Sequence, residues 1–94
     1  MQEAATGPVA TEMLRRLDSA LSPTRVRLVD DSENHRGHGG YNPEGESHFT
    51  LEIECEAFAG RSRVERQRMV YKALGDLMRE RVHALSIQAR APGE

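Results

Sequence analysis

The stretch FTLEIECE, residues 49–56, contains the clearest strand pattern in the chain. Its apolar residues Phe49, Leu51 and Ile53 alternate with Thr50 and with glutamates. A two-residue period of this kind is typical of a strand with one buried face and one solvated face. We therefore expect a sheet that packs against other elements on one side only.

A helix and a further strand are predicted downstream of this stretch. The sequence SRVE at residues 62–65 is a capping box, in which the Ser62 side chain accepts from the amide of Glu65 and the glutamate reaches back. The helix should run to about Glu80, and the alternating residues 82–90 should form the last strand. Because this is a β-α-β crossover, the strands on either side of the helix should be parallel. The apolar stripe of the helix consists of Val70, Ala73, Leu74, Leu77 and Met78.

Upstream of the central strand, the chain should form one helix and one short strand. Apolar residues at helical spacing predict a helix over 8–21, which ends before Pro23 because the residue preceding a proline is pushed out of the α region. Residues 25–30 alternate and predict a strand. The fold class is therefore α+β, with the order α-β-β-α-β and a three-stranded mixed sheet. The predicted common core consists of Phe49, Leu51, Ile53, Leu74, Leu77, Leu85 and Ile87.

The whole chain, residues 1–94, is expected to be a single domain with flexible ends at 1–7 and 91–94. Residues 31–47 contain four glycines and predict a long loop. A loop of this length inside a small domain is usually functional or disordered.

Composition narrows the function classes. The N-terminus has no apolar run and no apolar stretch approaches the length of a membrane span, so we expect a protein without a secretory signal or membrane segment. The lone Cys55 excludes an internal disulfide and fits a reducing cytoplasm. A chain of 94 residues has one modest core and little room for a deep cleft, and no Ser/His/Asp set, carboxylate pair or phosphate loop is evident. We therefore predict a cytoplasmic binding protein and not an enzyme.

Histidine is the most informative residue type. If the strands that begin near Phe49 and His83 are parallel, both start at the same end of the sheet. The long loop that carries His35 and His38 enters the sheet at Phe49. Topology alone therefore predicts that two or three imidazoles converge at this end, where they could bind a metal.

Several ordered blocks at characteristic separations also carry a family resemblance. They are Asp31-Ser32 with His35, Glu46-Ser47-His48-Phe49, Phe58 with Gly60, the run from Arg66 to Leu74, and the run from Val82 to Ile87. From about Leu14 to Pro92 the chain resembles the BolA family. The resemblance implies a fold similar to the class II KH domain, with a helix-turn-helix-like element at residues 62–80.

The resemblance also implies a partner and a cofactor. BolA-like proteins pair with monothiol glutaredoxins and glutathione and share a [2Fe–2S] cluster with them, in iron–sulfur assembly or trafficking and in iron or stress regulation. By position, His83 matches the C-terminal ligand of the family and His35 the second ligand. An insertion over residues 36–41 brings the extra His38, so the choice between His35 and His38 stays open. His48 matches the family at a position that is no ligand, and we interpret it as structural.

The cysteine count agrees with a shared cluster. An iron–sulfur cluster needs four ligands, mostly thiolates, although two histidines can replace two cysteines on one iron. Cys55 lies on the core side of its strand, where it is expected to act as a small hydrophobe. A partner must therefore supply the thiolates, and the chain alone is expected to carry no cluster and to be a monomer or a weak homodimer.

The alternative function is a DNA-binding transcriptional regulator. Residues 60–81 contain seven Lys or Arg against three Asp or Glu, whereas residues 1–59 contain five against eleven. Such a basic segment suits phosphate contacts, an acidic partner, or simply a solvated helix face. The Gly-x-x-Gly loop of true KH domains is missing, since residues 59–62 read AGRS. The candidate DNA-binding residues are Arg61, Arg63, Arg66, Arg68 and Lys72.

Overall fold

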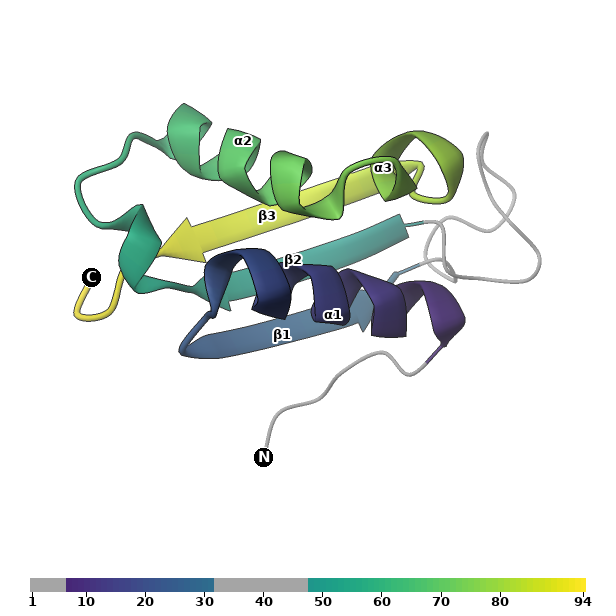
Figure 1. The fold of residues 1–94 in the computed structure, drawn as a ribbon, viewed down its shortest axis with the longest axis horizontal. Coiled ribbons are helices and arrows are strands. Elements are labelled where there is room, and N and C mark those ends of the chain that lie inside the picture. Colours follow the sequence, from purple (N-terminus) through teal and green to yellow (C-terminus); the bar gives the residue numbers. More distant parts are fainter. Residues whose placement is uncertain (1–6, 32–47) are drawn as a thin grey trace.

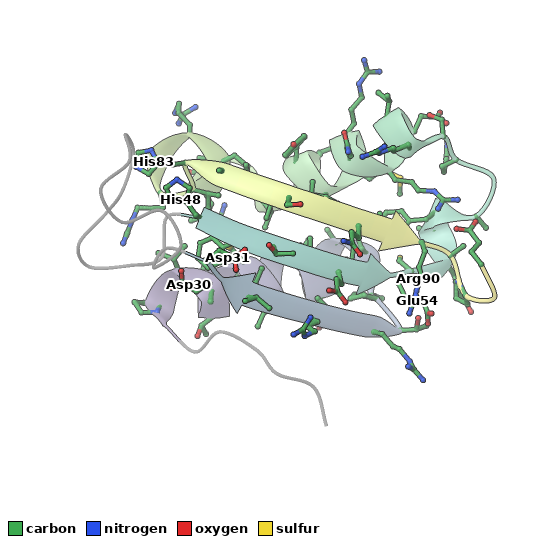
Figure 2. All side chains as sticks on the ribbon, turned by 180° about the vertical axis from the view of Figure 1, so that it is seen from behind. Asp30, Asp31, His48, Glu54, His83 and Arg90 are labelled. Atoms are coloured by element: carbon green, nitrogen blue, oxygen red, sulfur yellow. The ribbon has the colours of Figure 1, made fainter. Side chains whose placement is uncertain are left out.

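Three strands form one mixed sheet in the computed structural model, which describes residues 7–31 and 48–94 (Figure 1). The strand order is β1-β2-β3, where β1 is Arg25–Asp30, β2 is His48–Glu54 and β3 is Ala84–Arg90. Strand β1 pairs antiparallel with β2, and β3 pairs parallel with β2. The predicted α+β class, the mixed sheet and the parallel crossover are thus confirmed. Helices cover one face of the sheet, and the other face is open (Figures 1 and 2).

Helix α1 (Pro8–Leu21) has the predicted bounds. Proline suits its first position, because the missing amide would have no intrahelical partner there. The C-cap residue Ser22 has a left-handed backbone conformation with a φ of 48°, which ends the helix before Pro23.

The second helical segment begins as predicted but ends earlier. Helix α2 (Arg63–Leu74) starts with both hydrogen bonds of the Ser62–Glu65 capping box. The predicted continuous helix to Glu80 is wrong, because Gly75 takes a φ of 58° and ψ of −131°, which stops α2 and separates it from the short helix α3 (Leu77–Glu80). Such a backbone conformation strongly favours glycine.

An arginine from α1 stabilises this break. The Arg16 Nη1 donates to the carbonyl oxygen of Leu74 at 2.7 Å and to the Asp76 carboxylate at 2.8 Å. One of the carbonyls left without an intrahelical partner at the end of α2 is thereby satisfied. Strand β3 then starts at Ala84, two residues later than predicted, because the amide of Val82 donates to the carbonyl of Leu77 and so belongs to the end of α3.

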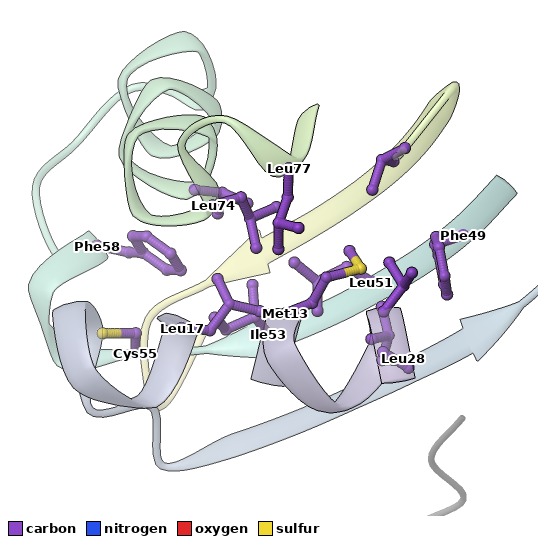
Figure 3. Packing of buried hydrophobic residues seen from close by; sticks show 14 of the residues in the cluster. Met13, Leu17, Leu28, Phe49, Leu51, Ile53, Cys55, Phe58, Leu74 and Leu77 are labelled. Atoms are coloured by element: carbon purple, nitrogen blue, oxygen red, sulfur yellow. The ribbon is translucent and has the colours of Figure 1, made fainter. Parts of the chain in front are cut away.

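The core lies between the helices and the inner face of the sheet (Figure 3). Of the predicted core residues, the five on β2, α2 and α3 are buried, whereas Leu85 and Ile87 on β3 are half-buried. The alternate residues Thr50, Glu52 and Glu54 face the open side and are more exposed, which confirms the predicted register. The buried members of the predicted set are Phe49, Leu51, Ile53, Leu74 and Leu77.

Several fully buried residues have no counterpart in the predicted common core, among them Met13, Leu17, Leu28 and Phe58. Phe58 is fully buried and ends the 3-10 helix η2 (Glu56–Phe58), a segment that the two-residue alternation of β2 does not reach. No helix within residues 7–31 and 48–94 is long and apolar enough to cross a bilayer.

Candidate functional site

Two histidines lie together where β2 and β3 begin (Figure 2). His48 is the first residue of β2 and pairs in register with Ala84, which follows His83 directly. The two rings are stacked, with centroids 6.1 Å apart and planes inclined by 21°. His48 is 6% exposed, whereas the His83 side chain is exposed to solvent. His83 is therefore an accessible nitrogen donor that lies against a buried imidazole.

The end of β1 lies at the same end of the sheet as the two histidines. Asp30 and Asp31 lie near the two histidines (Figure 2), because β1 runs antiparallel to β2 and ends where β2 begins. The amide of Asp31 donates to the carbonyl of His48 at 2.7 Å, and the Thr50 hydroxyl donates to the Asp31 carboxylate. In the described part of the chain, no three His, Cys, Asp or Glu side chains are grouped closely enough to hold a metal ion. The described residues thus offer one exposed imidazole, that of His83, and a metal ion bound there needs additional ligands.

The predicted loop ligands His35 and His38 lie outside the described residues. The segment that contains them joins Asp31 to His48, and both of these residues lie at the His83 end of the sheet. The chain connectivity is therefore compatible with the predicted convergence, which stays a prediction.

Cys55 lies too far away to join these histidines in one site. It directly follows β2 at the opposite end, and the seven residues of that strand span about 20 Å. The thiol is 1% exposed and donates to the carbonyl of Leu21 at 3.0 Å. The burial predicted for Cys55 is confirmed. The donor set fits an iron–sulfur cluster only if imidazoles come from this chain and thiolates from another.

The five basic candidates differ in what they contact. The Arg66 guanidinium makes two hydrogen bonds to the Glu94 carboxylate, at 2.6 and 2.7 Å, and also donates to the carbonyls of Ala89 and Arg61. The pKa of Arg66 is raised by these bonds to Glu94. Arg66 therefore joins α2 to the tail 91–94, which the sequence predicts to be flexible.

The remaining basic residues do not share one helix face. Within residues 7–31 and 48–94, Arg63, Arg68 and Lys72 are exposed and form no ion pair, and Arg61 is 3.9 Å from Glu65. Since successive helical residues are rotated by about 100°, Arg68 and Lys72 point roughly 140–180° away from Arg63. The angle between these side chains follows from their spacing along the helix. The number of charged residues in 60–81 does not reveal it.

Comparison with known proteins agrees with the observed fold. A family model of BolA-like proteins matches residues 17–94. SufE-like protein 1, chloroplastic/mitochondrial, of Arabidopsis thaliana is 37% identical over 94 residues, which are 96% of this chain and 25% of that protein. BolA-like protein 1 of Mus musculus is 36% identical over 91 residues, which are 97% of this chain and 64% of that protein. The chain thus spans less than two thirds of the length of these curated relatives.

Solved structures give the same result. The BolA domain of SufE1 from Arabidopsis thaliana superposes with a TM-score of 0.83 at 38% identity, over 94% of this chain and 96% of that one. BolA1 from the same plant gives a TM-score of 0.81 at 30% identity, over 95% and 98% of the two chains. On sequence and on fold, the chain belongs to the BolA family.

Proposed function

We propose that this BolA-family chain is the partner of a monothiol glutaredoxin and shares a [2Fe–2S] cluster with it. The observation that carries the proposal is the exposed His83 imidazole, which is stacked on buried His48 at the end of the sheet where the segment with His35 and His38 is attached. The proposed role is binding and not catalysis, in iron–sulfur assembly or trafficking and in iron or stress regulation.

The donor chemistry supports sharing with a second protein. Two imidazoles can occupy two positions on one iron, and the other positions require thiolates. Cys55 is buried about 20 Å from the histidine end. His83, with His35 or His38, would hold one iron, and a glutaredoxin cysteine with glutathione would supply sulfur to the other.

Co-expression with a monothiol glutaredoxin in the presence of glutathione tests the proposal. We expect a one-to-one complex whose absorption and circular dichroism spectra differ from those of the cluster-loaded glutaredoxin alone. The proposal would be contradicted if no complex formed under anaerobic purification. It would also be contradicted if the spectrum of the complex were the same as that of the cluster-loaded glutaredoxin alone.

A second candidate is a DNA-binding regulator. It is favoured by one observation, that Arg63, Arg68 and Lys72 are exposed and without an ion pair in the described part of the chain. Phosphate contacts release counterions, so binding should weaken steeply with added salt, and Arg63→Ala with Arg66→Ala should flatten that dependence. A mobility-shift titration with no binding near physiological salt would exclude this function. Because Arg66 also contacts Glu94, Lys72→Ala is the variant that tests charge without altering an internal contact.

A further inference from the structure

A hollow of about 660 Å³ lies at the end of the sheet opposite the histidines. Glu54 and Arg90 mark this end in Figure 2. The lining of the hollow spans the open face of all three strands near this end and continues past β3 to Arg61 and the first turns of α2. We call it the β3-edge groove. Its charged lining consists of Arg25, Arg27, Arg61, Arg63, Arg66 and Arg90 together with Glu52 and Glu54.

The groove contains the free edge of β3. The amide of Cys55 donates to the carbonyl of Arg90, so the backbone of Arg90 is directed toward β2. Since backbone groups alternate along a strand, those of Ile87 and Ala89 point to the outer edge. The Ala89 carbonyl accepts from Arg66 at 3.2 Å, whereas no hydrogen bond from the described residues meets the outward groups of Ile87. An unpaired edge of this kind is a template for another strand.

The groove also has surplus positive charge. Three of its arginines are neutralised: Arg27 by Glu52 at 3.0 Å, Arg90 by Glu54 at 3.4 Å and Arg66 by the tail residue Glu94 at 2.6 Å. In residues 7–31 and 48–94, Arg25 and Arg63 have no ion-pair partner, and the contact of Arg61 with Glu65 is a long 3.9 Å. The occupant that complements these charges is acidic.

We propose that the β3-edge groove binds an extended acidic segment of a partner protein, which adds a fourth strand to the sheet beside β3. Its backbone would pair with the outward groups of Ile87, and its carboxylates would contact Arg63 and Arg61. In this mode the backbone hydrogen bonds provide affinity and the alternate side chains provide specificity. Ile87 lies four residues beyond His83, about 13 Å along the strand, so the groove and the histidine site are separate positions on the sheet.

Three features favour a peptide over a nucleic acid. The free strand edge offers hydrogen bonds that match a peptide backbone. The lining has no aromatic side chain on which a base could stack. A nucleic acid that lay along α2 would be expected to contact Arg68 and Lys72 as well. These two residues do not line the groove.

A short synthetic peptide tests the proposal. The probe is a fluorescein-labelled nine-residue peptide of alternating glutamate and threonine, titrated with the full chain and followed by fluorescence anisotropy. Two matched peptides serve as controls, one with lysine in place of glutamate and one with every second backbone amide methylated. We expect both controls to bind at least about tenfold more weakly, because the first loses charge complementarity and the second loses the strand hydrogen bonds. In ¹H–¹⁵N spectra, the amides of Ile87 and Ala89 should shift on addition of the probe.

Charge reversal on α2 locates the site. Arg63→Glu should weaken probe binding at least about tenfold, whereas Lys72→Glu, on the other side of the same helix, should change it less than about twofold. His83→Ala should leave it unchanged, which separates this site from the proposed cluster function. Equal binding of the methylated peptide, or equal effects of Arg63→Glu and Lys72→Glu, would overturn the proposal. A duplex DNA that displaces the probe and depends on Lys72 would show that the surface binds nucleic acid instead.

Discussion

His83 stacks on His48 although α2 and α3 separate them in the sequence, with ring centroids 6.1 Å apart. The parallel register of β2 and β3 produces this contact, because it pairs His48 with Ala84. The exposed His83 ring therefore has the buried His48 ring beside it. In this way the crossover brings together two histidines that lie far apart in the sequence.

His83→Ala should remove the mixed-ligand spectrum of the complex with a glutaredoxin and leave the fold intact. The side chain is exposed and precedes β3, so its loss opens no cavity in the core. Absorption and circular dichroism spectra of the purified complex measure the first effect, and thermal unfolding of the free chain measures the second. The matched control is Cys55→Ala, which should retain the spectrum. If the His83→Ala complex kept an unaltered spectrum, the ligand assignment would be wrong.

The two loop histidines should differ in importance. His35→Ala and His38→Ala are compared in the same co-purification, with cluster content per complex as the measurement. His35 matches the second ligand position of the BolA pattern, so we expect its replacement to cause the larger loss. A larger loss of cluster with His38→Ala would identify the inserted histidine as the ligand. If both variants kept the cluster content of the wild type, neither loop histidine would be a ligand.

Leu51→Ala should lower the free energy of unfolding by about 2–5 kcal/mol, since it removes a fully buried side chain at the centre of the sheet. Leu51 pairs in register with Leu28 on one side and Ile87 on the other. Urea unfolding measures the change. Ser86→Ala, at an exposed position on the open face of β3, is the control and should change stability by less than about 0.5 kcal/mol. Similar losses for the two variants would disprove the assigned faces.

Glu94→Gln should destabilise the chain at neutral pH but not in strong acid. The pKa of Glu94 is lowered from 4.5 to about 2, mainly because Arg66 donates hydrogen bonds to its carboxylate and also because the Ala91 amide does. A lowered pKa in the folded state means that the ionised group contributes stability above pH 4.5, and that this contribution is lost as pH falls from 4.5 through about 2.

Thermal unfolding between pH 2 and pH 7 checks this expectation. The melting temperature of Glu94→Gln should be lower than that of the wild type at pH 7, and the two curves should converge near pH 2. Glu56→Gln is the control, since Glu56 is exposed and has no ion pair in the described residues. A difference between Glu94→Gln and wild type that is constant over this range would rule out the ion pair as its cause.

Patterns within short stretches determined most of the secondary structure. The alternation over 49–56, the capping box at Ser62 and the proline at residue 23 each act over a few residues, so the sequence alone predicts β2 and the starts or ends of the helices. The parallel crossover follows from element order as well, because few connections between strands and helices are sterically favourable. The convergence of His83 with the start of β2 could therefore be predicted.

Contacts between distant residues were decided only by the tertiary structure. The sequence shows Gly75, but it does not show that Arg16 of α1 donates to the Leu74 carbonyl at the end of α2, across 58 positions of the chain. The burial of Phe58 and the pairing of Arg66 with Glu94 likewise depend on where the elements pack. Local periodicity reports which face of an element is apolar, whereas the partner of a given side chain is fixed by how those faces meet in three dimensions.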